Sequence, residues 1–293
     1  MLQKAGLRRH DTQAGQEGYT LAAALLLGKD EVIKSVLPHY KIDALVRKVN
    51  TDRYDDRDYI DTNLIEAYDR LIDFTTKHLP DKFYMEGDQR VSLRAKIFRE
   101  VVANLIVHRE YTSGLAASFI IYKDRVETGN ANNPHGDGLI SPDNFAPFSK
   151  NPLIAKFFTQ LGRVDEIGSG VLNVNKYLPV YAPGKKPQFI EGSSFKMIIP
   201  LDVKLFEEFD RVSDIVTEGV TEGVKEKLTE LLQAITDKEG LKTDSYADIL
   251  GIPKKSIERY IKQLKEAGLI EFRGAPKTGG YYLIKTVKTK VKK

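Results

Sequence analysis

The stretch REVVANLIVHREY, Arg99–Tyr111, is the part of the sequence from which the fold is predicted. In a helix, with about 100° per residue, Glu100, Asn104 and His108 fall on one stripe because each is four residues from the next. Apolar residues cover most of the remaining surface, which indicates a buried helix. A carboxylate, an amide and an imidazole on such a helix must be hydrogen-bonded, paired or turned toward a pocket. The pattern predicts either a polar seam satisfied by neighbouring backbone or a functional site.

The composition limits the classes of protein that the chain can belong to. Its 293 residues are enough for two domains, and the 41% hydrophobic and 29% charged content is typical of globular proteins. No apolar run reaches the ~18 residues of a membrane span, and the first residues lack a signal-peptide core, so we expect no membrane partner. The absence of cysteine excludes disulfides and thiolate sites and favours a cytoplasmic location. Five histidines without an HExxH motif argue against a metalloenzyme.

The charge is distributed unevenly along the chain. Residues 251–293 hold 12 Lys and Arg against 3 Asp and Glu, a net charge of +9. Because the whole chain carries +4, residues 1–250 carry −5. Only the C-terminal end therefore has the electrostatics of a polyanion-binding domain.

Hydrophobic periodicity and turn residues predict five segments. The tandem repeat VTEGVTEG, residues 216–223, has the composition of a linker. We predict a small α/β segment at 1–58, an α/β domain at 59–203, a linker at 204–223, a helical domain at 224–285 and a basic tail at 286–293.

Individual elements of the first two segments follow from the same patterns. We predict helices over 19–27, from the cap Asp61-Thr62 to 78, from 93 to 111, from the cap Asn151 to 162, and up to 177. We predict strands over 39–48, 83–85, 89–91, 116–122, 125–128, 188–191 and 195–201, with irregular structure at 51–58 and 129–138.

The C-terminal segment has the pattern of a winged helix-turn-helix, with three helices and a two-stranded wing. Its third helix, from Pro253 to Ala267, would enter the major groove of double-stranded DNA. Ser256 and Arg259 are spaced to reach base edges, and Lys254, Lys255, Lys262, the wing residue Lys277 and the tail 285–293 to neutralise phosphates. The alternative is a winged helix used for protein contacts or dimerisation.

Four stretches carry a resemblance to a known family. They are REVVANLIVHREY (99–111), NNPHG (132–136), KNPLIAKFFTQLGRVDEIGSG (150–170) and SSFKMIIPL (193–201). Residues 61–201 resemble the ATP-binding module of RecG-like, or Schlafen AlbA-type, transcriptional regulators, a divergent relative of the GHKL fold. The resemblance implies an α+β protein, with helices on a mixed, mostly antiparallel sheet, followed by the winged helix. Such regulators usually carry a further N-terminal domain, which we expect this chain to lack.

The resemblance also implies roles for the stripe and the glycines. Glu100 would be the general base that orients water, and Asn104 would hold Mg²⁺ against the phosphates. His108 would lie at the same nucleotide site. Gly168 and Gly170 would cradle phosphate at a helix N-terminus.

The loop that would contact the base departs from the family pattern. Asn133 and Gly136 lie where the fold normally carries Asp-x-Gly-x-Gly, whose aspartate accepts the adenine amino group, and this sequence has no aspartate there. Residues 136–162 would form the lid.

Three functions follow from these patterns. The first is a homo-oligomeric, DNA-binding transcriptional regulator with an ATP- and Mg²⁺-binding sensor module and half-sites about one helical turn apart. The second is a slow Mg²⁺-dependent ATPase. The third is a degenerate scaffold that binds no nucleotide. A helicase motor is excluded because the sequence has no G-x4-G-K-[ST] phosphate loop.

Overall fold

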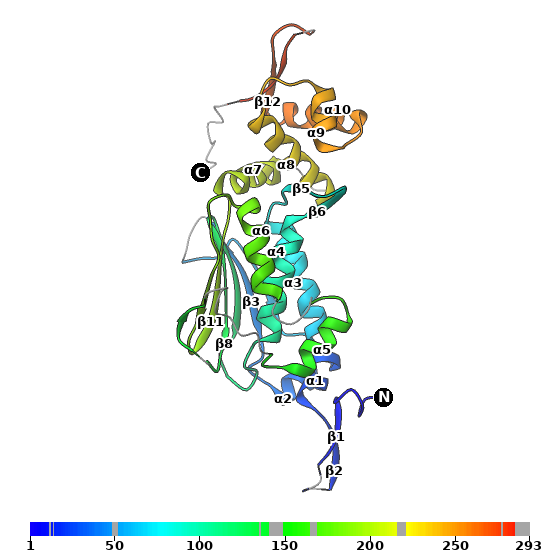
Figure 1. Ribbon diagram of the computed structural model, residues 1–293, viewed down its shortest axis with the longest axis vertical. Coiled ribbons are helices and arrows are strands. Elements are labelled where there is room, and N and C mark those ends of the chain that lie inside the picture. The colour runs from blue at the N-terminus through cyan, green and yellow to red at the C-terminus, as the bar shows by residue number, and fades with distance from the viewer. Residues whose placement is uncertain are drawn as a thin grey trace. The chain divides into compact units, whose positions relative to one another are not determined.

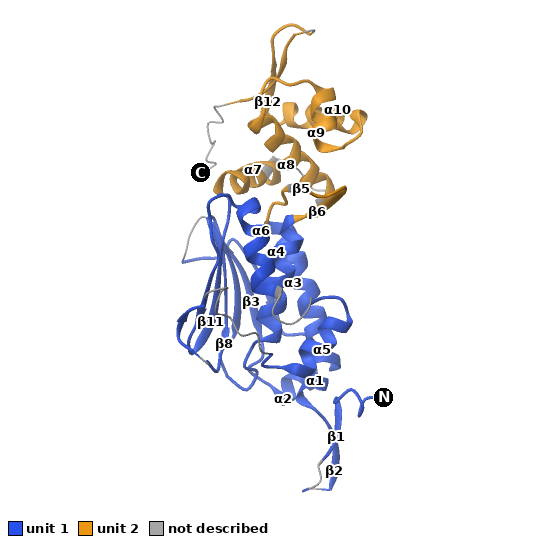
Figure 2. Cartoon of the chain, in the orientation of Figure 1, with its two compact units in different colours: residues 1–78, 93–202 blue, residues 79–92, 203–293 orange. Residues whose placement is uncertain are grey.

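The computed structural model describes residues 1–11, 13, 15–48, 52–134, 136–140, 149–164, 169–215, 221–276 and 278–284. The chain divides into two compact units, one of residues 1–78 with 93–202 and one of residues 79–92 with 203–293 (Figure 2). Helices and a mixed sheet occur together, which confirms the predicted α+β class.

The first unit is built on a seven-stranded sheet. Its strands are β3 (Ile42–Arg47), β4 (Asp56–Ile60), β7 (Ala117–Tyr122), β8 (Arg125–Ala131), β9 (Gly138–Leu139), β10 (Gln188–Glu191) and β11 (Ser194–Pro200). They lie in the order β4-β3-β7-β8-β11-β10-β9. Only β3 and β7 pair in parallel; the other neighbours are antiparallel. The strands predicted from alternation in this part of the chain are confirmed.

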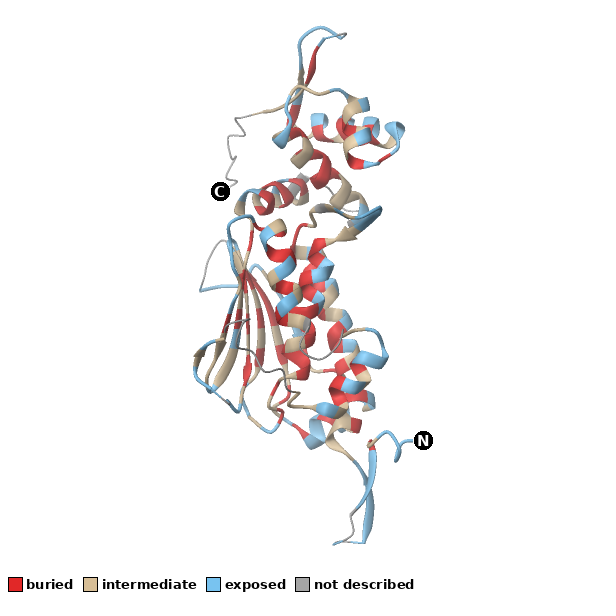
Figure 3. Ribbon diagram, viewed as in Figure 1, coloured by how far each residue is buried: buried red, intermediate tan, exposed pale blue. Residues whose placement is uncertain are grey.

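Helices cover one face of this sheet. The helices of the unit are α1 (Leu21–Leu27), α2 (Asp30–Val36), α3 (Leu64–His78), α4 (Leu93–Val107), α5 (Pro152–Gln160) and α6 (Ser169–Tyr181), and a hairpin of β1 (Arg8–Asp11) and β2 (Gln16–Tyr19) precedes them. Helices α3, α4 and α6 lie along the sheet (Figure 1). Buried positions recur along α4 and the central strands (Figure 3). Phe98 of α4 meets Phe119 of β7 edge to face, with 6.4 Å between ring centroids.

The second unit joins a hairpin to four helices and a second hairpin. Its elements are β5 (Phe83–Glu86), β6 (Gln89–Ser92), α7 (Val203–Ile215), α8 (Glu222–Asp237), α9 (Thr243–Leu250), α10 (Lys254–Glu266), β12 (Ile270–Arg273) and β13 (Gly280–Leu283). Leu231 and Leu232 of α8, Tyr246 of α9 and Ile257 of α10 are all fully buried in one core. The predicted helices α8, α9 and α10 and the two predicted hairpins are confirmed, whereas α7 was not predicted.

The predicted linker at 204–223 is wrong in part, because most of it is helical. Helix α7 occupies residues 203–215, and α8 already begins at Glu222. Leu205, Phe206, Phe209 and Val212 of α7 are at most 1% exposed, so the segment has an apolar face with helical spacing beneath its charges. Residues 216–220 lie outside the described residues.

Two segments predicted as irregular contain strands. β4 begins at Asp56, inside the predicted loop at 51–58, and β8 continues through Gly129 to Ala131. β4 is the edge strand beside β3, and its charged side chains make ion pairs, among them Lys77 to Asp56 at 2.7 Å. Charged side chains on an edge strand commonly prevent it from pairing with strands of other chains. Here they also interrupt the alternation of apolar and polar residues from which a strand is predicted.

The predicted helix caps also need correction. The side chain of Asn63, and not of Asp61 or Thr62, accepts a hydrogen bond from the backbone N–H of Glu66 at 3.0 Å in the first turn of α3. Asn151 does occupy the N-cap position of α5, but its side chain makes no capping bond there.

No helix among the described parts of the chain has both the length and the apolarity needed to cross a membrane.

Candidate functional site

Glu100 of α4 lies where α6 begins. Its side chain is buried, with the residue 8% exposed, and Asn173 of α6 donates a hydrogen bond from Nδ2 to Oε1 at 2.8 Å. A Cβ atom on Gly170 would stand 3.0 Å from Oε2, so glycine allows the first turn of α6 to approach the carboxylate. The N-terminal end of a helix also favours a negative charge. The structure thus brings together two of the predicted site residues, Glu100 and Gly170, and adds Asn173.

Asn104 follows one turn later on the same helix. Its Oδ1 atom is buried and accepts no hydrogen bond within the described chain. Leaving such an acceptor unsatisfied costs about 1–3 kcal/mol, so the position favours a bound donor or a hard cation. The described residues contain no cluster of three or more His, Asp or Glu side chains that could hold a metal ion. Asn104 could therefore supply one oxygen ligand to a cation.

His108 completes the predicted stripe, one residue beyond the end of α4. Its backbone N–H donates to the carbonyl of Asn104 at 3.0 Å, so the helical turn continues to it. Burial, with the nearby Lys150 ammonium as a smaller cause, lowers the pKa of His108 to about 4. The imidazole is therefore neutral at neutral pH.

Lys150 connects this stripe to the loop that was predicted to contact a base. Its Nζ atom donates to the backbone carbonyl of Asn133 at 2.9 Å. Burial lowers the pKa of Lys150, against smaller opposing effects of Glu191 and Glu110. Lys150 was not among the site residues predicted from the sequence, although it directly precedes the Asn-Pro pair that opens α5. Asn133 and His108 thus both lie near one ammonium group.

The loop itself is tied to the turn between β10 and β11. Asn132 donates from Nδ2 to the carbonyl of Gly192 at 2.9 Å. A Cβ atom on Gly136 would stand 3.6 Å from Oε2 of Glu191, an ordinary contact distance. The carboxylate of Glu191, at the end of β10, therefore lies beside Gly136, in the loop that lacks the aspartate of the family pattern. Gly168, the other predicted glycine of the site, lies outside the described residues, as does the central part of the predicted lid.

A second candidate site lies on α10 in the other unit. The helix buries one face through Ile257, Tyr260, Ile261 and Leu264. The opposite face exposes three of the predicted DNA-contacting cations, Lys255, Arg259 and Lys262. At the start of the helix Lys254 is exposed and Ser256 is half-buried. Lys277 lies outside the described residues.

Two of the α10 cations have acidic neighbours. Lys254 lies 2.7 Å from a carboxylate oxygen of Asp244, and Lys262 lies 3.8 Å from one of Glu266. Exposed pairs of this kind are weak and exchange readily with other anions. Arg259 stacks over Tyr260, with 5.1 Å to the ring centroid, which limits the conformations of its guanidinium. The face therefore presents cations that a phosphate backbone could bind.

Comparison with known proteins adds little to this geometry. A family model described as a domain of unknown function, DUF8451, matches residues 1–43. No curated protein matches the chain. The crystal structure of the DIP2311 protein from Corynebacterium diphtheriae is similar over 96% of this chain, with 18% sequence identity and a TM-score of 0.49. This chain spans 56% of the length of that protein.

Proposed function

We propose that the protein is a DNA-binding transcriptional regulator, with α8 to β13 acting as a winged helix-turn-helix that places α10 in the major groove. The observation that carries this proposal is the exposed cationic face of α10 opposite its buried apolar face. Gly251, in the left-handed conformation at φ 61°, makes the turn from α9 into α10, and the β12–β13 hairpin follows. The net charge of +9 over residues 251–293 supports the same partner.

Titration of labelled double-stranded DNA at several salt concentrations tests this proposal. Affinity should fall steeply with salt, and Lys255→Ala should reduce the magnitude of the log–log slope by about 0.9, the change for one lost phosphate contact. Arg259→Ala should relax sequence preference by about 1–3 kcal/mol. Lys238→Ala, an exposed cation after α8, is the matched control and should change neither quantity. DNA binding that is independent of salt and of both α10 residues would contradict the proposal, as would no binding.

We further propose that the first unit is a divergent GHKL-like module, as in RecG-like or Schlafen AlbA-type regulators, that binds ATP with Mg²⁺. The buried, unpartnered Oδ1 of Asn104 beside Glu100 supports this assignment. Asn104 would hold the ion, which when bound would neutralise phosphate charge, and Gly170 keeps the start of α6 close to Glu100. Glu100 would accept a proton from water if the module is a slow ATPase. In a degenerate scaffold it would only anchor α6.

Thermal unfolding with Mg-ATP separates these possibilities. ATP at 100 times its dissociation constant stabilises a protein by about 2.7 kcal/mol. Asn104→Ala should abolish this stabilisation. Glu100→Gln should keep it but stop phosphate release if Glu100 is the base. Equal rates of phosphate release from the wild type and Glu100→Gln would eliminate the proposal that the module is an ATPase. If Mg-ATP does not stabilise the wild type, only the scaffold that binds no nucleotide remains.

The remaining expectations extend this proposal. A homo-oligomer would present two copies of α10 to half-sites about one helical turn apart, and the protein would act in the cytoplasm. Sedimentation with and without a palindromic duplex tests the first of these.

A further inference from the structure

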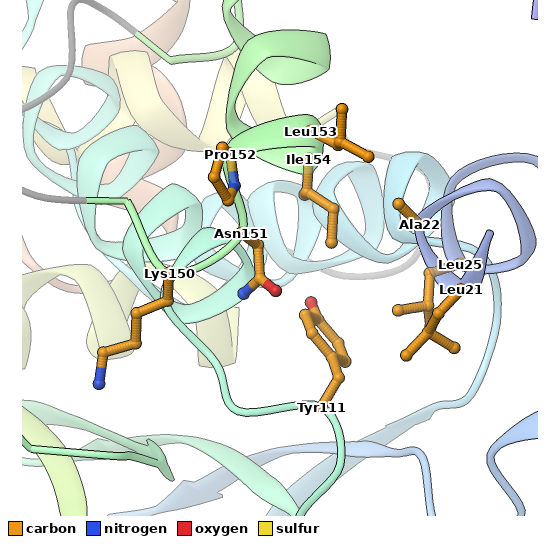
Figure 4. A pocket seen from close by; sticks show the side chains of 9 residues that line it. All are labelled: Leu21, Ala22, Leu25, Tyr111, Lys150, Asn151, Pro152, Leu153 and Ile154. Carbon is orange, nitrogen blue, oxygen red and sulfur yellow. The ribbon is translucent and has the colours of Figure 1, made fainter. Parts of the chain in front are cut away.

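The helices of the first unit form a pocket of about 170 Å³ between α1 and the beginning of α5 (Figure 4). Most of its lining side chains are apolar, among them Leu21 and Leu25 of α1. Its three polar side chains, Tyr111, Lys150 and Asn151, each already donate a hydrogen bond to a backbone carbonyl. The pocket therefore offers few groups for recognising a polar ligand. Charged and aromatic side chains gather instead on the other side of the sheet.

The side of the seven-stranded sheet that faces away from the helices is assigned strand by strand. Phe119 of β7 packs on Phe98 of α4, so Ile120, the next residue in the pleat, points away from the helices. The strand registers extend this assignment to the neighbouring strands. The helices of the unit lie on the other side (Figure 1), and we call the surface that they leave uncovered the open face. It presents six exposed or half-buried side chains that matter below: Arg47, Arg57, Tyr59, Tyr122, Arg125 and Lys196.

The open face carries more positive than negative charge. Its cations are the four named above and Lys41, and its carboxylates are Asp43 and Glu127, which gives a net charge of 5 − 2 = +3. Residues 1–250 as a whole carry −5, so this positive surface contrasts with its surroundings. Arg57 and Arg125 pair with the two carboxylates, whereas Arg47 and Lys196 form no ion pair within the described residues. The surplus charge favours an anionic partner.

The tyrosines of the open face lie beside its cations. The guanidinium of Arg125 stacks over the ring of Tyr122, at 4.3 Å from the ring centroid. Arg57 and Lys41 lie 5.5 and 5.6 Å from the ring centroid of Tyr59, which is 46% exposed. Tyrosine rings and guanidinium planes are the surfaces on which unpaired bases stack. The two tyrosines are separated by two strand spacings and four residues, about 16 Å. One strand of several nucleotides can therefore contact both.

We propose that the open face binds single-stranded nucleic acid, with bases stacked on Tyr59, Tyr122 and the guanidinium groups beside them and with phosphates at Arg47 and Lys196. The surplus charge alone would also suit an acidic protein segment, but such a segment has few rings to stack on the tyrosines. In a duplex the bases are stacked on one another, so the tyrosines would reach none of their faces. Sheets whose aromatic side chains stack two or three bases are one mode of RNA recognition. The open face does not include α10, so this inference does not rest on the function proposed above.

Fluorescence anisotropy of the full chain with labelled oligo(U) and oligo(dT) of about twelve nucleotides tests the proposal. Tyr59→Ala and Tyr122→Ala should each weaken binding of both oligonucleotides about tenfold, a typical loss for one stacked base. Tyr122→Phe keeps the ring and should bind like the wild type. Arg47→Met should reduce the magnitude of the log–log salt slope by about 0.7, the change for one phosphate contact on a single strand. A polyglutamate peptide of similar length should bind much more weakly than either oligonucleotide.

Tyr19→Ala is the matched control, since Tyr19 is an exposed tyrosine on the β1–β2 hairpin, and it should leave binding unchanged. Residues 251–293 are also basic, so ultraviolet crosslinking to oligo(U) that contains 5-iodouridine, followed by mass spectrometry of peptides, locates the contact. We expect crosslinks in β4 and β7. Circular dichroism identifies any variant that fails to fold, and the exposed Tyr59 carries the test if Tyr122→Ala does not fold.

Four results would each overturn the proposal. They are no binding of either oligonucleotide to the wild type, undiminished binding by folded Tyr59→Ala, crosslinks confined to residues 251–293, and equal affinity for polyglutamate and oligo(U).

Discussion

Asn173 of α6 donates a hydrogen bond to Glu100 of α4, with 2.8 Å between Nδ2 and Oε1. The residue assigned as a general base from the resemblance is therefore also an attachment point between two helices. A glutamine at position 100 can still accept the bond through its amide oxygen, whereas alanine removes it. Comparing the two variants separates the chemical role of Glu100 from its structural one.

Gly170→Ala should destabilise the first unit. Its new Cβ would stand 3.0 Å from Oε2 of Glu100, so the carboxylate or the start of α6 must shift. We expect a loss of about 1–3 kcal/mol in the free energy of unfolding. Urea denaturation measures it. Gly114→Ala, where a Cβ would meet nothing within 4 Å, should change stability by less than about 1 kcal/mol. A similar effect of both substitutions would contradict the packing described for Gly170.

His108 should make stability depend on pH. The unfolded chain binds a proton at a histidine near pH 6.5, whereas burial holds the pKa of His108 at about 4 in the folded state. Between these values the unfolded state binds more protons, so stability falls as the pH is lowered from 6.5 to 4. We expect His108 to contribute on the order of 1–2 kcal/mol to this fall, allowing for screening.

Urea denaturation at pH 7, 5.5 and 4.5 measures this dependence. His108→Gln should reduce the fall without removing it, because burial also lowers the pKa of His78 to about 4. The exposed His10→Gln variant should behave like the wild type. An unchanged pH dependence in His108→Gln would show that the imidazole is not buried in the neutral form.

Arg90→Met should destabilise the second unit. Arg90 of β6 pairs with Glu230 of α8, whose side chain is only 2% exposed, and Lys227 lies 3.2 Å from the other carboxylate oxygen. Burial raises the pKa of Glu230 in spite of both cations. Removing Arg90 leaves a buried carboxylate with Lys227 alone, at a cost of about 1–3 kcal/mol.

The matched control for Arg90→Met is Arg273→Met, which breaks an exposed pair with Glu271 in the same unit. That change should cost less than about 1 kcal/mol. Adding Glu230→Gln to Arg90→Met should recover part of the lost stability, because it removes the buried charge. Chemical denaturation of the four proteins tests the prediction, which fails if Arg90→Met and Arg273→Met have equal effects.

Asn151→Asp should destabilise the first unit although it would improve an ordinary helix N-cap. The amide group of Asn151 donates to the carbonyls of Val107 and Arg109, and a carboxylate would place negative charge against both. We expect a loss of about 2–4 kcal/mol, measured by thermal unfolding. Asn63→Asp, at the position that does cap α3, should change stability by less than about 1 kcal/mol. If Asn151→Asp instead stabilises the protein, the side chain at position 151 contributes mainly by capping α5 and not by binding the two carbonyls.

The elements predicted best from the sequence were those whose side chains face a single core. Helix α10 shows this clearly, since Ile257, Ile261 and Leu264 recur at helical spacing and all are buried. The edge strand β4 was missed because its charges pair with α3, for example Asp58 with Arg70. Helix α7 was missed because a linker-like repeat follows it and its charged residues obscured the apolar face.

The candidate site was predictable only along one helix. Glu100 and Asn104 lie four residues apart on α4, so their shared face follows from helical periodicity. Asn173 and Lys150 come from α6 and from the residues before α5, and no local pattern indicates that they approach α4. The same limitation applies to Asn151, whose amide binds the carbonyl of Val107, 44 residues earlier in the chain.

The β5–β6 hairpin has a consequence for how the protein could have evolved. Residues 79–92 belong to the second unit although α3 and α4 of the first unit flank them in sequence, so the backbone passes between the units three times. A single recombination breakpoint therefore cannot exchange one unit without dividing the other. Relatives that acquired a new C-terminal unit by simple gene fusion would have to lose, replace or re-pair this hairpin. Arg90 of β6, the partner of Glu230, should thus change together with α8 among such relatives.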